Sequence, residues 1–218
     1  MFVNIHAHSA ITTKDTIEIV QHSYSDKTQP NTLHSVGIHP WISQNVSAEM
    51  CVDFLDTATQ NTKACFIGEC GIDRACSVPL HVQIPVFETC VLFAQKNHYP
   101  LLIHCVRAYS DVLHILKQNN VTVPVIFHDF RGNSQQVKQL SAFQSFFSFG
   151  ISLTTSQKAQ EVFCDIPLSQ IFLETDVADF SIASLYKNAA YLKAISLETL
   201  SNQIMENFER VIGNKPYR

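Results

Sequence analysis

The sequence predicts an α/β fold, a TIM-type (β/α)8 barrel that is truncated or irregular in its first β/α units. Three observations lead to this prediction. Short apolar segments alternate along the chain with segments of helical periodicity. The apolar segments are almost continuously hydrophobic, as strands are when both faces of a parallel sheet are covered. Eight such segments occur, which is the number of strands in this barrel.

The elements follow from this alternation. We expect strands at residues 1–5, 16–20, 33–38, 64–68, 100–103, 123–127, 143–149 and 170–173. We expect helices at 48–61, 80–97, 109–119, 133–141 and 155–164, and two more within 184–210. Only seven residues separate His8 from Thr16, fewer than the dozen or so that a parallel crossover helix needs. We therefore expect loops in place of the early helices.

Composition and charge narrow the class of protein. The 218 residues carry a net charge of −4, and no linker, repeat or low-complexity segment marks a second domain. We expect one domain over residues 1–218, without a broad basic surface for nucleic acid. No apolar run approaches the roughly 20 residues of a membrane-spanning helix, and the first residues lack the features of a signal peptide, so we expect no membrane partner. Seven cysteines without a CxxC pair indicate free thiols and a cytoplasmic location.

Residues that can bind a metal stand at the ends of six of the eight expected strands. His6 and His8 end the first strand, where their spacing of two points both imidazoles to one side. The other strand ends supply His39, Glu69, Asp73, His104, His128, Glu174 and Asp176. Barrel enzymes place their chemistry at the carboxyl ends of the strands. The coincidence over six strands therefore predicts one shared metal site.

These residues lie in motifs that together resemble the TatD-like metal-dependent deoxyribonuclease family, a branch of the amidohydrolase-type barrels. The motifs are HxH at 6–8, GIHP at 37–40, IGECGID at 67–73, IHC at 103–105, FH at 127–128 and LETD at 173–176. The sequences HCVRA at 104–108 and FHDFRG at 127–132 resemble a short bacterial subgroup of that family. The resemblance runs from residue 1 to about residue 212.

The resemblance implies a site for two divalent metal ions. The first ion would be held by His6, His8 and Asp176, the second by His104 and His128, with Glu69 bridging the two. This mixed nitrogen and oxygen set contains no thiolate and suits Zn, Mn or Mg. Asp176 would orient or deprotonate a metal-bound water, which makes Asp176 and Glu69 the candidate catalytic residues. Because the first strand leads into the truncated part of the barrel, we expect the first ion to be held more loosely.

Three further residues are candidate substrate contacts. His39 would contact a substrate phosphate or hold a ligand residue in place; the alternative is a packed histidine. Arg107 and Arg131 each follow a candidate ligand histidine by three residues, and their guanidinium groups would clamp a phosphodiester. The alternative for both is a surface ion pair.

Two more acidic residues accompany these candidates. We expect Asp73 to fix the loop after Glu69. Glu174 stands two residues before Asp176, so its side chain points into the same barrel interior and can bond to a ligand histidine.

The chain departs from the family's pattern close to these residues. Asn4 stands where the family usually has Asp, and Asp129 stands where glycine is usual. The carboxylate of Asp129 would either help to hold metal or obstruct an anionic substrate. Val177 follows Asp176 in place of the more common Ser-Pro. All six ligands are nevertheless retained, so we expect metal binding.

The implied function is that of a metal-dependent hydrolase acting on ester bonds, a deoxyribonuclease that cleaves phosphodiester bonds at DNA ends through water activated by two metal ions. The chain has no net positive charge and no segment in which aromatic and basic residues alternate, as they do in proteins that track along a single strand. Both observations favour action at the ends of DNA. One alternative keeps the barrel and hydrolyses a small phosphoester or a cyclic amide; another is a metal-binding protein without turnover. The expected partner is thus DNA or a small phosphoester substrate, and the sequence indicates no oligomeric state.

Overall fold

Eight parallel strands form one sheet in the order of the sequence, from β1 to β8. The structure is a computed structural model that describes residues 1–9, 14–26, 31–60 and 62–213. The strands are β1 Phe2–Ala7, β2 Thr16–Ser23, β3 His34–Gly37, β4 Ala64–Asp73, β5 Leu101–Val106, β6 Val125–Phe127, β7 Ser145–Phe149 and β8 Ile171–Leu173. A bridge between Ala7 and Asp176 joins the two ends of the sheet. The sheet is thus a nearly closed barrel, which confirms the predicted fold.

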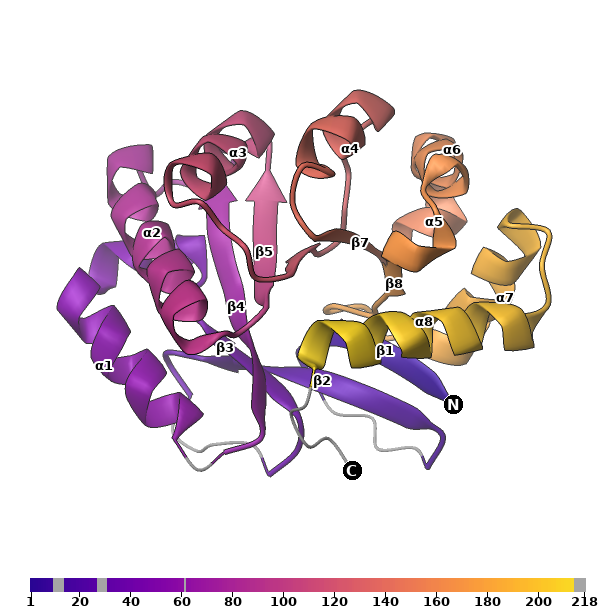
Figure 1. Ribbon diagram of the computed structural model, residues 1–218, viewed down its shortest axis with the longest axis horizontal. Helices are drawn as coiled ribbons and strands as arrows, with labels where there is room; N and C mark the ends of the chain where they lie inside the picture. Colours follow the sequence, from indigo (N-terminus) through magenta and orange to yellow (C-terminus); the bar gives the residue numbers. More distant parts are fainter. Residues whose placement is uncertain (10–13, 27–30, 61, 214–218) are drawn as a thin grey trace.

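The helices lie outside and around the strands (Figure 1). They are η1 Pro40–Asn45, α1 Ala48–Thr59, α2 Leu80–Asn97, α3 Tyr109–Gln118, α4 Ser134–Leu140, α5 Ser152–Thr155, α6 Gln157–Asp165, η2 Leu168–Gln170, α7 Ile182–Leu192 and α8 Leu197–Ile212. Every predicted helix has a counterpart, although Asn61, where the first was expected to end, lies outside the described residues. The short α5, η1 and η2 were not predicted. No helix in the described part of the chain has the length and apolar character needed to cross a bilayer.

The first two connections of the barrel differ from the rest. Their described residues, 8–9 and 14–15 between β1 and β2, and 24–26 and 31–33 between β2 and β3, contain no helix. The first helical segments, η1 and α1, come only after β3. The expected truncation of the early barrel is therefore confirmed.

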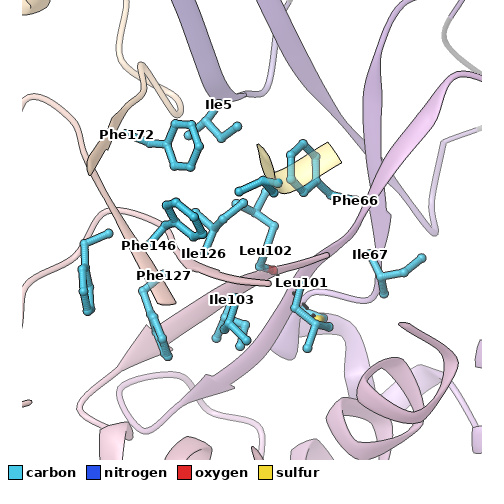
Figure 2. Close-up of a cluster of buried hydrophobic side chains, with 14 of the residues drawn as sticks. Ile5, Phe66, Ile67, Leu101, Leu102, Ile103, Ile126, Phe127, Phe146 and Phe172 are labelled. Carbon is cyan, nitrogen blue, oxygen red and sulfur yellow. Dashed lines mark hydrogen bonds between the residues drawn. The ribbon is translucent and has the colours of Figure 1, made fainter. Parts of the chain in front are cut away.

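A bulge distorts β1 at Ile5 and His6, between Asn4 and Ala7. Asn4 pairs with Glu18 and Ala7 pairs with Val20, so β1 has one residue more than β2 between these pairs. Ile5 and His6 are both fully buried although they are neighbours. Figure 2 shows Ile5 beside Phe172 in the apolar interior. The bulge therefore allows β1 to supply one side chain to the core and the next to the polar end of the barrel.

Apolar side chains fill the barrel interior. In Figure 2, a ring of side chains turns toward one centre, formed by Ile5, Phe66, Leu102, Ile126, Phe146 and Phe172. Ile67, Leu101, Ile103 and Phe127 point away from that centre. Burial of both sets explains why the strands read as continuous hydrophobic runs.

Helix α8 closes the amino-terminal end of the barrel. The ring of Phe208 lies 6.5 Å from that of Phe66 near the start of β4. The side-chain amide of Asn207 donates to the carbonyl oxygens of Leu168 and Ile171 at 2.8 and 2.9 Å. The guanidinium of Arg210 lies 5.0 Å from the centre of the Phe146 ring. Helix α8 thus covers the end of the barrel opposite to the carboxyl ends of the strands, where the polar residues lie.

We predict that Phe208→Ala lowers the free energy of unfolding by about 3 to 5 kcal/mol, because it empties a fully buried position in this seal. Urea denaturation measures the change. Tyr191→Ala, at an aromatic residue that is 84% exposed on α7, serves as the control and is expected to stay within about 0.5 kcal/mol of the parent. Equal effects of the two substitutions would contradict the role given to α8.

Candidate metal centre

Glu69 stands within a strand that runs further than predicted. We expected the strand to end at residue 68, but β4 continues to Asp73 and its register against β5 shifts between Ile67 and Cys70. Gly68 and Gly71 flank the glutamate with φ angles of 150° and 152°. A Cβ on Gly71 would lie 1.9 Å from the carbonyl oxygen of His104. Only glycine permits this close approach of β4 to β5.

Side chains of β2 and β3 anchor the backbone of Glu69 on β4. Its N–H donates to Oε1 of Gln21 on β2 at 2.7 Å. The same Gln21 oxygen accepts a hydrogen bond from the Ser35 hydroxyl on β3 at 2.8 Å. Three strands therefore set the position of one carboxylate.

The first carboxylate oxygen of Glu69 faces three imidazoles. Oε1 lies 2.7 Å from Nδ1 of His104, 2.7 Å from Nε2 of His128 and 3.2 Å from Nε2 of His39. The ligand atoms of His39, Glu69 and His104 all lie within 4.8 Å of one another, as metal ligands do. His39 was predicted as a substrate contact, and the structure brings it to the same carboxylate oxygen as two predicted ligands.

The second carboxylate oxygen faces the histidines of β1. Oε2 of Glu69 lies 3.4 Å from Nε2 of His6 and 3.7 Å from Nε2 of His8. Oδ1 of Asp176 lies 3.5 Å from the first of these nitrogens and 3.3 Å from the second. His6, His8 and Asp176 form a second group that can hold a metal ion. The predicted ligands thus come together from both ends of the chain.

His6 supplies an observation that fits a bound cation. Its imidazole is fully buried, and neither ring nitrogen has a hydrogen-bond partner in the described structure. A buried polar group without a partner is costly. A metal ion bound to Nε2, between the carboxylates of Glu69 and Asp176, would supply the missing interaction.

Two carboxylates behind the histidines hold their orientation. Nε2 of His104 lies 3.3 Å from Oδ2 of Asp73, and Nδ1 of His128 lies 3.2 Å from Oε1 of Glu174. The contact of Glu174 confirms the predicted bond to a histidine of the site. Asp73 fixes its loop, as expected, through the N–H of Ala75 at 2.7 Å, but its contact with His104 was missed. The sequence feature that could have revealed this contact is the spacing of four residues between Glu69 and Asp73, which puts their side chains on the same face of an extended strand.

The site favours positive charge on His6 and His128 and negative charge on Glu69, whereas burial lowers the pKa of His39. Burial opposes ionisation of Glu69, but the charge of His128 and the surrounding hydrogen bonds hold the pKa of Glu69 well below its usual range. Burial also opposes protonation of His6, yet the nearby carboxylates of Asp176 and Glu69, at 3.5 and 3.4 Å from Nε2, raise the pKa of His6 to about 9. The pKa of His128 is raised in the same way by Glu69 and Glu174 against burial. The carboxylates that favour protonation of His6 and His128 also favour the binding of metal cations.

The two arginines lie at the rim, around a cavity of about 570 Å³ that opens beside His104 and His128. Arg107 and Arg131 line this cavity together with Lys158. Nε and Nη2 of Arg131 each lie 2.8 Å from Oδ2 of Asp129. Asp129 thus pairs with this arginine and belongs to none of the groups that can hold a metal among the described residues.

The comparisons with known proteins agree with this architecture. The family described as TatD related DNase matches residues 2–213. The chain is 24% identical over 194 residues to an uncharacterized metal-dependent hydrolase, YabD, of Bacillus subtilis, which covers 81% of the chain and 76% of that protein. It is 30% identical over 154 residues to the 3'-5' RNA nuclease TATDN2 of Homo sapiens, which covers 66% of the chain but 20% of that larger protein.

A solved structure supports the fold. The crystal structure of the TatD homolog YJJV from Escherichia coli superposes with a TM-score of 0.80 at 17% identity, over 96% of this chain and 97% of that one. At this identity the likeness shows the fold alone. The match to the family, which extends over nearly the whole sequence, shows that the chain belongs to the TatD related DNase family.

Proposed function

We propose that this protein cleaves phosphodiester bonds at DNA ends with water activated by two divalent metal ions. Family membership makes the chain a metal-dependent hydrolase; the two ions, the DNA substrate and the action at ends are our proposal. The observation that carries it is the position of Glu69, whose two carboxylate oxygens face two different sets of imidazoles.

We assign six ligands on this basis. Because its two oxygens face separate sets of imidazoles, Glu69 would be shared by two ions, which would supply charge stabilisation for displacement at phosphorus. The first ion would be held by His6, His8 and Asp176, the second by His104 and His128, with Glu69 shared. The nitrogen and oxygen donors suit Zn, Mn or Mg.

We infer that Asp176 orients the attacking water and accepts its proton. When bound, the ions would lower the pKa of a water and offset negative charge at the phosphate. The side chain of Asp176 is 29% exposed at the mouth of the site, while Glu69 is buried beneath it. Asp176 is therefore our candidate for orienting the water and accepting its proton. Glu174 and Asp73 keep His128 and His104 in position.

The cavity beside His104 and His128 supports a phosphate-bearing substrate. Arg107, Arg131 and Lys158 surround it, and Asp129 offsets the charge of Arg131. Arg107 is therefore the stronger candidate for a phosphate contact. His39 would either contact the phosphate or complete the ligands of the second ion. Because these cations are confined to one rim on a chain of net charge −4, the arrangement supports contact with a chain end.

A second candidate is hydrolysis of a small phosphoester. A cavity of about 570 Å³ is of the size that small molecules occupy in proteins. A panel of end-labelled single- and double-stranded DNA, matching RNA and small phosphoesters separates these substrates. Cleavage of small esters with both nucleic acids untouched would replace the proposed function with this one.

We predict that protein purified without chelator contains one to two divalent ions per chain, as measured by elemental analysis. Glu69→Ala is expected to lose most of the metal and about a thousandfold or more in activity, because several kcal/mol of transition-state stabilisation depend on the ions. A chain that binds no metal, even after addition of Mn or Zn, would contradict the assignment of the ligands.

We predict that Arg107→Ala lowers kcat/KM on DNA by about ten- to a hundredfold, the loss of one charge-assisted contact of about 1.5 to 3 kcal/mol, with metal content unchanged. Arg74→Ala is the matched control, because the guanidinium of Arg74 already pairs with Asp111 at 2.8 Å in two bonds. A similar loss in both variants would argue against a specific phosphate contact of Arg107.

We predict that chelator-treated protein loses stability as the pH rises from 6.5 to 9. The pKa of His6 is raised from 6.5 to about 9 by folding, so its contribution is fully present below pH 6.5 and is lost as the pH passes 9. The loss is on the order of 3 kcal/mol for this group, and His128 adds to it. Urea denaturation at several pH values measures the slope.

His6→Gln should make this slope shallower, and saturation with metal should reverse the trend, because metal binding displaces the protons and tightens as the pH rises. A slope that is the same in the parent and in His6→Gln would show that His6 does not carry the effect.

A further inference from the structure

Trp41 is the one tryptophan of the chain and lies exposed beside the candidate metal centre. It belongs to η1, and its side chain is 59% exposed. Its ring centre lies 4.7 Å from that of His39 and 6.4 Å from that of His104, with interplanar angles of 81° and 76°. An exposed large apolar side chain at a polar site is an informative feature.

The indole is held in a fixed orientation. Its Nε1–H donates to Oδ2 of Asp73 at 2.7 Å, and its backbone N–H donates to Nδ1 of His39 at 3.2 Å. Pro40 at the start of η1 restricts the backbone before it. The ring has therefore lost much of its conformational freedom before any ligand binds, which favours recognition.

No aromatic side chain lies parallel to this ring in the described part of the structure, and the residue is 59% exposed. The rings of His39 and His104 meet the indole nearly at right angles. A flat aromatic group can therefore lie on the exposed indole.

We propose that Trp41 is the stacking platform for an unpaired nucleobase next to the scissile phosphate. The inference rests on the proposed function and adds the recognition of the base. His39, in ring contact with Trp41, lies 3.2 Å from Glu69, so a phosphate held at the metal centre brings its adjoining nucleoside to the indole. Stacking on an aromatic ring tolerates any base and contributes about 1 to 3 kcal/mol.

Stacking on Trp41 would favour unpaired ends of the substrate over duplex ends. A base can lie on the indole only after it has left the duplex stack, so the site takes single-stranded or frayed ends. Recognition by an aromatic ring also needs no broad basic surface, in agreement with the net charge of −4.

The single tryptophan makes the stacking directly measurable. The experiment titrates the metal-loaded protein with a single-stranded oligonucleotide that carries phosphorothioate linkages at both ends, and follows tryptophan fluorescence. We expect strong quenching by this oligonucleotide and little quenching by one whose terminal nucleotides are abasic. Equal quenching by both, or none by either at concentrations that saturate binding in a separate assay, would overturn the proposal.

Kinetics of three variants separate stacking from positioning. Trp41→Ala is expected to lower kcat/KM by about ten- to a hundredfold on a single-stranded oligonucleotide with ordinary phosphodiester linkages, and to change it less than about threefold on the same oligonucleotide with abasic terminal nucleotides. Trp41→Phe keeps a ring but removes the hydrogen bond to Asp73, and should retain most of the activity. Tyr191→Ala, at an exposed aromatic residue on α7, is the control.

The outcomes distinguish this inference from the proposed function. If Trp41→Phe falls as far as Trp41→Ala, and both fall equally on the abasic oligonucleotide, Trp41 acts only by holding Asp73 and the stacking role is wrong. If the parent protein cleaves no nucleic acid, the proposed function fails, while quenching by base-bearing ends would still establish the stacking.

Discussion

The buried carboxylate of Glu69 is the constraint on which the rest of the site depends. A charged carboxylate at this depth is costly unless opposite charge and hydrogen bonds compensate it. Five imidazoles supply that compensation, and they come from β1, β5 and the segments that follow β1, β3 and β6: His6, His8, His39, His104 and His128. A charged Glu69 at this depth therefore depends on the convergence of distant segments of the chain.

Closure of the barrel between β1 and β8 completes this arrangement. The N–H of Asp176 donates to the carbonyl oxygen of His6, and the N–H of His8 donates to that of Asp176. Asn4 donates to the Thr175 hydroxyl at 2.9 Å and accepts from the Thr175 N–H at 3.0 Å. An asparagine can make both bonds without placing a further charge at this buried seam, which gives a physical reason for the departure from the aspartate usual in the family.

Much of the site could be predicted because strand-end chemistry is local. The spacing of His6 and His8, and the His, Glu and Asp residues at other strand ends, are visible in the sequence, and barrel closure is enough to bring them together. The contact between Asp73 and His104 was missed because β4 continues beyond Gly68, where glycine suggests an end. The ion pair of Arg131 with Asp129 depends on a local backbone turn, which no periodicity reveals.

That ion pair changes what the rim can recognise. Asp129 has a φ of 37°, a region that favours the glycine usual in the family, and its N–H donates to Glu174 at 2.8 Å. Its side chain offsets the charge of Arg131, so the rim has less positive charge for a phosphate chain than its sequence suggests. Beside His39 and His104, an exposed indole is held in place by Asp73. Under the proposed function, recognition therefore depends less on positive charge along a strand and more on one phosphate and the base next to it.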